Sequence, residues 1–423
     1  GITRATNDDS QWLAAEAKAL RETGWWNNYR KRVGNHCLWP CIRCNAGSVV
    51  EIDLSLHGLN GGITPQIGAL SKLRYLNLSL NSLTGELPSS IGNLTQLAVL
   101  DVSHNYIEYP IPLAIQKMEN LVSLNLSMNS FIGDLPSSIG NLTQLAVLDV
   151  SYNDIDSIPP NIGKLRSMVD LDLSNNWPLG PIPSSISNLT NLASFLQNNE
   201  LNGSITQEIG RLRNLVSLDL SSNSLLGPIP SSISNLTNLA SLFLQNNELN
   251  GSIPQEIGRL RNLVALDLSS NSLVGPIPSS VSDLTNLAQF FLQSNKLNGS
   301  IPQEIGRLTK LFALDLSSNR LVGPIPSSVT YLTNLASLFL QSNQLNGSIP
   351  QEIGRLTKLF ALDLSSNSLV GPIPSNVSDL TNLTQFFLQS NKLNGSIPQE
   401  IGRITKLFAL DLSSNRLVGP IPS

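Results

Sequence analysis

The residues best suited to metal or redox chemistry lie in one short stretch near the start of the chain. His36, Cys37, Cys41 and Cys44 fall within nine residues and include all three cysteines of the sequence. Thiolate and imidazole groups bind zinc, and a C-x-x-C pair can act as a redox dithiol. However, nine contiguous residues would have to wrap around one ion, and no β-α-β pattern surrounds Cys41 and Cys44. We therefore expect no metal site, no redox centre and no cofactor here.

Histidine-dependent catalysis would have to use His36, His57 or His104, the three histidines of the chain. None of them lies in a G-x-S-x-G or comparable context, and the sequence contains no Walker, G-x-G-x-x-G or H-E-x-x-H motif after a suitable element. We expect His57 to replace an asparagine in a turn and His104 to lie on an outer strand face. The sequence therefore predicts that this chain has no catalytic site.

The charge balance argues against nucleic acid as a partner. The chain has 26 basic and 30 acidic residues, a formal charge of −4, and only 13% of its residues are charged. An average soluble protein has about 25%, and phosphate-driven binding requires a basic surface. No run of 18 apolar residues is present, so we expect no membrane span within the chain.

The elements that position these residues follow from an internal repeat. From Val49 onward the chain repeats L-x-x-L-x-x-L-x-L-x-x-N-x-L-x-G-x-I-P, with a spacing of 24 residues except for two intervals of 23, which end at Asn176 and Asn199. Counting His57 as the first, sixteen residues occupy the asparagine position, and the others are Asn81, Asn105, Asn129, Asn153, Asn176, Asn199, Asn223, Asn247, Asn271, Asn295, Asn319, Asn343, Asn367, Asn391 and Asn415.

Each part of the repeat has a physical reason. The L-x-L segment alternates with period two, which indicates a short strand with its leucines facing inward. The asparagine can bond backbone groups where the chain turns away, and Gly-x-Ile-Pro is typical of a second turn. One repeat cannot bury its leucines alone, so neighbouring repeats must stack into a solenoid.

The repeat closely resembles the plant extracellular leucine-rich repeats of receptor-like kinase ectodomains. The N-terminal segment extends the resemblance, because Cys37, Trp39, Ile42 and Cys44 fit the C-x-W-x-G-V-x-C pattern of the family's cap. Gly24-Trp25-Trp26 is similar to the subgroup that detects secreted peptides, whereas Cys41 stands where the family has glycine. The resemblance implies an α/β solenoid, a right-handed leucine-rich-repeat superhelix of plant-specific 24-residue repeats. We expect a cap over residues 1–48, with a helix from Asp9-Ser10, and a solenoid over residues 49–423.

The resemblance also implies a disulfide between Cys37 and Cys44 that staples the cap. A terminal repeat needs such a cap because its outer leucine layer would otherwise face water. Cys41 would then be an odd thiol, either free or paired with another chain.

Sequence patterns for N-glycosylation are abundant and, with the cap cysteines, favour a secreted or cell-surface protein. Repetition of N-L-T and N-G-S also multiplies chance matches, and Asn77 and Asn125 match the pattern too. Because residue 1 follows no signal peptide and Ser423 ends in mid-repeat, we expect a mature fragment of a longer product. The expected acceptors are Asn93, Asn141, Asn188, Asn202, Asn235, Asn250, Asn298, Asn346, Asn376, Asn382 and Asn394.

The outward strand positions carry a second pattern. From Asp172 onward, the residue four places before each asparagine position alternates between aspartate and phenylalanine, and the phenylalanines are Phe195, Phe243, Phe291, Phe339 and Phe387. Alternation keeps like charges off neighbouring strands, where they would repel. The regular aromatic residues could instead form a contact surface.

In the N-terminal half the outward residues vary and are partly aromatic, which is consistent either with a peptide-binding strip or with simple sequence drift. The candidate ligand-binding residues are Tyr75, Leu80, Val99, Asp101, His104, Met128, Asp149, Tyr152, Asp170 and Asp172.

Two irregular places stand out within the repeat. Asp149 and Asp172 break the charge alternation on adjacent strands, either as tolerated strain or as a site for a cationic ligand group. In the second short repeat, counting back from Asn199 puts Ser194 in a buried leucine position and Phe195 outward. We therefore predict a bulge or local distortion at Ser194.

The resemblance implies a function at the cell surface. We expect the ectodomain of a plant receptor kinase, on the extracellular side of the plasma membrane or secreted, which binds a secreted peptide on its inner face. The resemblance also implies a shorter leucine-rich-repeat co-receptor near the C-terminal repeats and a kinase domain outside this chain. The alternative is a soluble extracellular protein, of the polygalacturonase-inhibitor or ice-binding type.

Overall fold

The computed structural model describes residues 7–27, 35–176, 180–196 and 200–422. Contacts divide the chain into two compact units, residues 1–201 (unit 1) and residues 202–423 (unit 2), and each is described by itself. Both units are leucine-rich-repeat solenoids, so the predicted fold class is confirmed. None of the helices in the described residues is long and apolar enough to cross a membrane.

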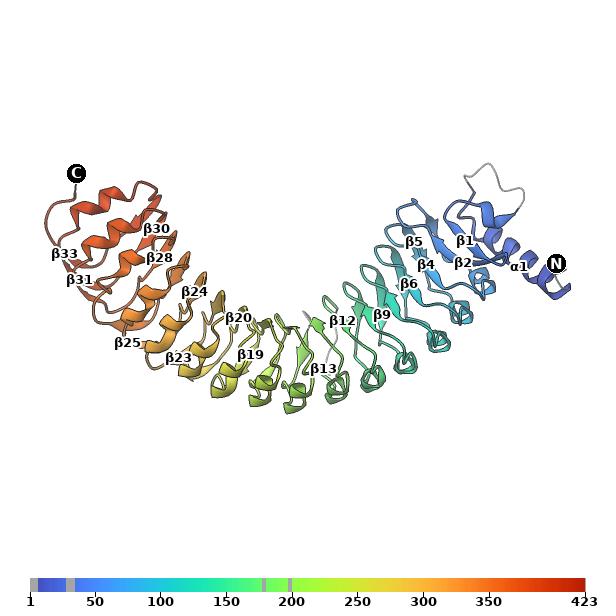
Figure 1. Cartoon of the computed structure of the whole chain (residues 1–423), viewed down its shortest axis with the longest axis horizontal. Coiled ribbons are helices and arrows are strands. Elements are labelled where there is room, and N and C mark those ends of the chain that lie inside the picture. Colours follow the sequence, from blue (N-terminus) through green and yellow to red (C-terminus); the bar gives the residue numbers. More distant parts are fainter. Residues whose placement is uncertain (1–6, 28–34, 177–179, 197–199, 423) are drawn as a thin grey trace. The chain divides into compact units, whose positions relative to one another are not determined.

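Each unit is built on a sheet of short parallel strands, one from each repeat (Figure 1). The L-x-L segments form these strands, and equivalent leucines pair across neighbouring repeats, as Leu242 does with Leu266. In unit 1 the strands are β2 (Ser48–Asp53), β4 (Tyr75–Asn77), β6 (Val99–Asp101), β8 (Ser123–Asn125), β10 (Val147–Asp149), β12 (Asp170–Asp172) and β14 (Ser194–Leu196). In unit 2 they are β16 (Ser217–Asp219), β18 (Ser241–Phe243), β20 (Ala265–Asp267), β22 (Gln289–Phe291), β24 (Ala313–Asp315), β26 (Ser337–Phe339), β28 (Ala361–Asp363), β30 (Gln385–Phe387) and β32 (Ala409–Asp411).

A second set of strands, which the sequence did not predict, follows the asparagine position of each repeat. They end at the Gly-x-Ile-Pro segment, where only a turn was expected, and the glycine adopts a positive φ there, +81° at Gly275. These strands are β3 (Asn60–Gly61), β5 (Ser82–Gly85), β7 (Tyr106–Tyr109), β9 (Ser130–Gly133), β11 (Asp154–Ile155), β13 (Gly180–Pro181), β15 (Leu201–Asn202), β17 (Leu226–Pro228), β19 (Glu248–Asn250), β21 (Val274–Pro276), β23 (Lys296–Asn298), β25 (Val322–Pro324), β27 (Gln344–Asn346), β29 (Val370–Gly371), β31 (Lys392–Gly395) and β33 (Arg416–Leu417).

The far side of most repeats is closed by a 3-10 helix, which in most cases begins directly after the proline. Pro278 is the N-cap of one such helix, where its missing N–H needs no partner. The 3-10 helices are η2 (Pro65–Ala69), η3 (Ser89–Asn93), η4 (Leu113–Lys117), η5 (Ser137–Asn141), η6 (Pro160–Lys164), η7 (Ser184–Asn188), η8 (Gln207–Arg211), η9 (Ser231–Asn235), η10 (Gln255–Arg259), η11 (Ser279–Asp283), η12 (Gln303–Arg307), η13 (Ser327–Tyr331), η14 (Ile353–Arg355), η15 (Ser375–Asp379) and η16 (Gln399–Arg403).

The core of each repeat lies between the sheet and the 3-10 helix. Leu263, Leu268 and Leu273 are fully buried, as the period predicts. The asparagine closes the turn as expected. The Asn271 amide nitrogen donates to the carbonyls of Leu244, Leu268 and Ser269, and its Oδ1 accepts from the Leu249 N–H. These bonds satisfy backbone groups of two adjacent repeats and so hold the stack in register. Asn199 lies outside the described residues.

The cap of unit 1 combines the helix α1 (Asn7–Thr23), the short 3-10 helix η1 (His36–Leu38) and the strand β1 (Ile42–Asn45), which pairs antiparallel with β2. The ring of Trp26 lies 6.0 Å from that of Trp25 and 5.6 Å from that of Trp39, measured between centroids. The Trp26 indole N–H donates to the Pro40 carbonyl at 2.9 Å. These contacts bury Trp25, Trp26 and Trp39 in an aromatic cluster inside the cap.

The prediction for the second short repeat was wrong. The strand β14 pairs with β12 in an unbroken register, in which Phe195 lies opposite Leu171 and Ser194 lies opposite Asp170. Phe195 is fully buried and thus fills the leucine position that the count had given to Ser194. The strand β14 therefore keeps the regular register, because an apolar ring in the core is favoured over a serine hydroxyl there.

Candidate functional site

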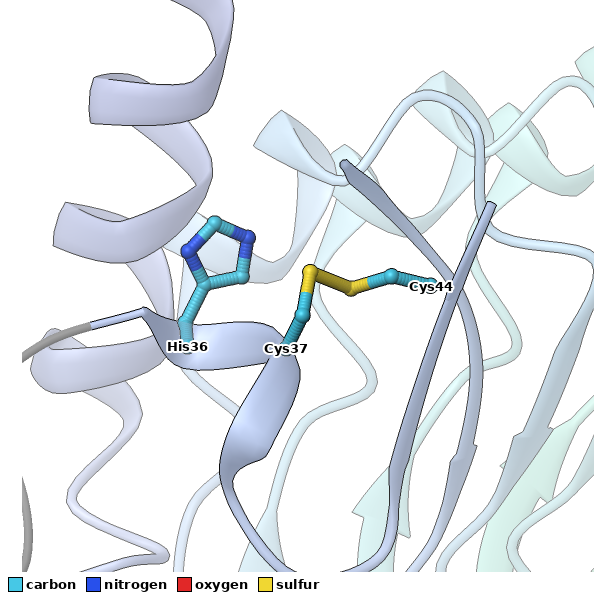
Figure 2. Close-up of side chains that lie close together, drawn as sticks. All are labelled: His36, Cys37 and Cys44. Carbon is cyan, nitrogen blue, oxygen red and sulfur yellow. A yellow bond between two sulfur atoms is a disulfide. The ribbon is translucent and has the colours of Figure 1, made fainter. Parts of the chain in front are cut away.

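The cap cysteines serve structure rather than metal binding. Cys37 and Cys44 form a disulfide with a Cα–Cα distance of 5.6 Å, and His36 lies beside it (Figure 2). Because both sulfur atoms are covalently paired, neither is available as a thiolate ligand for zinc. The free Cys41 contacts His57 instead, with 3.2 Å between Sγ and Nε2, and burial together with Asp53 raises the pKa of its thiol. The arrangement therefore does not form a C-x-x-C redox pair.

A hollow of about 260 Å³ lies on the inner face of unit 1, the side of the main sheet that faces away from the core. It extends over strands β4 to β14. The residues that line it are Tyr75, Val99, Asp101, Ser123, Asn125, Val147, Leu148, Asp149, Asp170, Asp172 and Ser194. Four of these lining residues are aspartates and none is Lys or Arg, so the hollow is acidic without an internal counter-charge.

The acidic end of the hollow is formed by the strands β10 and β12. Their register places Asp149 opposite Asp172, and Val147 opposite Asp170. The predicted break in charge alternation is therefore present in space. Burial raises the pKa of the Asp172 carboxyl above its ordinary value, and the charges of Asp149 and Asp170 raise it further. Hydrogen bonds from Ser174 oppose that change. The site thus holds a carboxylate whose charge is poorly compensated.

The structure brings together six of the ten candidate ligand-binding residues. Tyr75, Val99, Asp101, Asp149, Asp170 and Asp172 all line the hollow. Sequence reasoning did not select five further lining residues, although the same strand columns could have identified three of them. Those five are Ser123, Asn125, Val147, Leu148 and Ser194.

The other four candidates lie outside the hollow, in the turn that follows each strand. Leu80, His104, Met128 and Tyr152 have positive φ angles of 56°, 52°, 53° and 52°. The corresponding turn residue from Asn175 onward is Asn or Ser in the described repeats. The left-handed conformation costs a bulky residue roughly 1–2 kcal/mol. These four form an exposed row beside the hollow, which we call the turn row.

The predicted glycosylation acceptors differ in accessibility. Asn250, Asn298, Asn346 and Asn394, at the ends of the strands β19, β23, β27 and β31, are exposed. Asn93, Asn141, Asn188, Asn202, Asn235 and Asn382 are exposed as well. Asn376 is half-buried, and its amide nitrogen donates to the Gln351 carbonyl. A glycan attached to that nitrogen would displace a bond between two repeats.

We therefore expect Asn376 to remain unmodified when the chain is expressed in plant cells, and the four strand-end acceptors to be glycosylated. Site-resolved glycopeptide mass spectrometry measures the occupancy of each. High occupancy at Asn376 would contradict this expectation. Asn382 provides the matched comparison. Its amide nitrogen also donates to a carbonyl of the preceding repeat, that of Thr357 at 2.9 Å, but its side chain is exposed, so lower occupancy at Asn376 than at Asn382 would be due to burial.

Comparisons with known proteins identify the family. Models of the leucine-rich repeat match residues 72–94, 213–273, 310–332, 334–356 and 358–380, and a model of a leucine-rich repeat region matches residues 124–222. No curated protein sequence matches the chain.

The solved structures that match the chain include the following three. The plant peptide hormone receptor RGFR1 in complex with RGF2 is 38% identical over 91% of this chain and 65% of its own length, with a TM-score of 0.88. A TDR receptor is 35% identical over 87% of this chain and 68% of its own, with a TM-score of 0.80. The ectodomain of GASSHO1/SCHENGEN3 from Arabidopsis thaliana was solved in complex with CASPARIAN STRIP INTEGRITY FACTOR 2. It is 30% identical over 97% of this chain and 59% of its own length, with a TM-score of 0.70.

This chain spans 65% of the length of the first of these relatives. The matched receptor ectodomains are ligand-binding rather than catalytic domains, which confirms the expectation that this chain is not an enzyme. The chain belongs to the leucine-rich-repeat family and, within it, to the ectodomains of plant receptor kinases.

Proposed function

We propose that this chain is the sensing part of a plant cell-surface receptor kinase and binds a secreted peptide in the hollow of unit 1. The hollow is the observation that carries the proposal. It combines an apolar and aromatic end at Tyr75 and Val99 with an acidic end at Asp149, Asp170 and Asp172. An extended peptide with one basic side chain would match both ends, since a cation would relieve the repulsion between the aspartates.

The turn row supports the same proposal. Its four bulky side chains accept an unfavourable backbone conformation and remain exposed, which adds nothing to the core. Backbone strain of this kind is often retained where function requires the side chain. Exposed Met and Tyr next to an elongated hollow would extend the contact surface along one edge of a bound peptide.

The relatives support a proposal for the ligand and the location. Two of the matched structures are receptor ectodomains in complex with named ligands, RGF2 and CASPARIAN STRIP INTEGRITY FACTOR 2. For this chain we accordingly propose a secreted peptide ligand and a position on the extracellular side of the plasma membrane. A shorter leucine-rich-repeat co-receptor is proposed from the family resemblance of the repeats alone.

A random peptide library tests the proposal, because selection from it requires only the receptor chain. We expect a phage-displayed library of 12-residue peptides, selected against the whole chain, to yield extended sequences that contain a basic residue. Binding of each selected peptide is then measured by fluorescence anisotropy against the chain and against Tyr75→Ala. Loss of affinity in that variant is expected, because the phenol ring lines the hollow.

If the library yields no binder, or if the selected peptides bind Tyr75→Ala unchanged, the proposal fails. Phe312→Ala, which removes an exposed aromatic ring from unit 2, is the matched control and should leave binding intact.

A further inference from the structure

The inner face of unit 2 repeats every two strands rather than every strand. Asp267, Asp315, Asp363 and Asp411 occupy one outward position on β20, β24, β28 and β32. Phe243, Phe291, Phe339 and Phe387 occupy the same position on the intervening strands. The registers place each Phe directly opposite an Asp, as with Phe291 and Asp315. All eight side chains are partly exposed, so the face presents alternating rings and carboxylates.

The carboxylates of this face have no cationic partner in the described part of unit 2. Each accepts a hydrogen bond from a serine two residues later, as Asp315 does from the Ser317 N–H at 2.9 Å. The ion pair found in unit 2 joins Arg307 to Asp283, on 3-10 helices on the far side of the repeat. Burial raises the pKa of Asp315, and the charges of Asp267 and Asp363 raise it further. The face therefore carries a row of carboxylates without cationic partners among the described residues of unit 2.

The phenylalanine strands add a row of unsatisfied acceptors. The Oε1 atoms of Gln245, Gln293, Gln341 and Gln389, two residues after each Phe, are buried and have no hydrogen-bond partner among the described residues. A buried acceptor without a partner costs roughly 1–3 kcal/mol. If the glutamine side-chain amide rotates toward the surface, its oxygen can accept a hydrogen bond from a ligand donor. Such a bond would remove that cost once in every two strands.

The spacing of this pattern selects one ligand conformation. Adjacent strands lie about 4.8 Å apart, so equivalent groups recur about every 9.6 Å. A polyproline II helix rises about 3.1 Å per residue with three residues per turn, which gives about 9.3 Å per turn. Across the three intervals between four aspartates the mismatch is only about 1 Å. An extended β-strand repeats its side-chain direction after about 6.8 Å and would lose register.

We propose that the inner face of unit 2 docks a polyproline II segment of a partner polypeptide that carries a basic residue at every third position. Each cation would lie near one aspartate, and the proline rings between them would pack on the phenylalanines. Aromatic-lined surfaces bind such segments because the helix is already formed before binding and little conformational entropy is lost. The non-proline N–H of each turn is free to donate to a glutamine oxygen.

This interaction is separate from peptide sensing in unit 1, so each can fail without the other. The probe is the synthetic peptide (Pro-Pro-Lys)5, and binding to the whole chain is measured by isothermal titration calorimetry at low and moderate salt. We expect it to bind at least about tenfold more tightly than an isomer with the same composition but with its five lysines in one block. (Pro-Pro-Glu)5 should not bind. Equal affinity for both lysine peptides, or no binding of either, overturns the proposal.

Matched variants locate the surface. Asp315→Asn/Asp363→Asn should weaken (Pro-Pro-Lys)5 by at least about tenfold. The fold should tolerate the change, because Asn77 and Asn125 occupy the equivalent position in unit 1 and accept the same serine N–H bond. Asp149→Asn/Asp172→Asn, in unit 1, should leave this affinity unchanged. An unchanged affinity in the unit 2 variant, or a loss in the unit 1 variant, contradicts the assignment.

Discussion

Asp149→Asn/Asp172→Asn is expected to weaken the selected peptides by at least about 30-fold. Removing one partner of a desolvated charge pair costs about 2–5 kcal/mol of binding free energy. Since about 1.4 kcal/mol corresponds to a tenfold change in affinity, the lower bound corresponds to about 30-fold. The amide keeps the shape of the carboxylate and its Oδ1 can still accept the Ser151 and Ser174 N–H bonds, at 2.9 Å in both cases. The loss should therefore reflect charge rather than a damaged turn.

The same variant is expected to be more stable than the parent chain at neutral pH. A carboxyl whose folded pKa is raised contributes stability that is complete below its unfolded pKa, about 3.9, and is lost as the pH rises through the folded value. Asp172→Asn removes the titrating carboxyl and therefore this loss of stability at neutral pH. Thermal unfolding should show a higher midpoint for the variant near pH 7, and the difference should shrink as the solution is acidified.

Peptide binding should depend on pH in the opposite direction to stability. Protonation of Asp172 removes the negative charge that attracts the ligand cation, so affinity should fall as the pH is lowered through the raised pKa of that group. Asp219→Asn in unit 2 is the control, because it removes one carboxylate of the same column and keeps the Ser221 N–H bond at 2.9 Å. Unchanged peptide affinity in Asp149→Asn/Asp172→Asn, or a loss of affinity in Asp219→Asn, would contradict the assignment of the acidic end.

The regular parts of the fold could be predicted because one physical requirement recurs in every repeat. Leucines at fixed spacing must be buried, and an asparagine such as Asn271 must satisfy the turn. The odd-numbered strands from β3 to β33 and the 3-10 helices were missed because each is too short to show a period of its own. Gly-x-Ile-Pro indicates a turn whether or not the preceding residues pair with a neighbour.

The residue of β14 that fills the buried leucine position could not be predicted by counting back from the asparagine position. Counting from Asn199 assumes that the shortening precedes the strand, whereas core packing keeps β14 in register with β12 and buries Phe195. The candidate site shows the same limit. The hollow follows from strand columns that the sequence reveals, but the left-handed turn at Met128 does not, because Met gives no signal of the kind that Gly or Asn gives.

Stacking of the repeats predicts a large and position-dependent effect of a single methyl group. Gly258 and Gly402 lie in the same five-residue sequence, Q-E-I-G-R, in η10 and η16. A Cβ built on Gly258 would lie 2.4 Å from the backbone oxygen of Ser280 in the next repeat, whereas a Cβ on Gly402 meets no atom of the described residues within 4 Å. The glycine at position 258 is therefore required by close approach between repeats.

Gly258→Ala is expected to destabilise unit 2 by about 1–3 kcal/mol, because the backbone of the neighbouring repeat must move to accept the methyl group. Gly402→Ala in this 423-residue chain should be neutral or slightly stabilising, since alanine restricts the unfolded chain more than glycine does. Hydrogen exchange resolved by repeat measures both effects, and only Gly258→Ala should reduce protection on the repeats that flank it. Equal loss in both variants would show that the helix backbone, and not the contact between repeats, requires glycine. In a solenoid, where each repeat contacts only its neighbours, the disturbance should decay along the stack and leave binding in the unit 1 hollow unchanged.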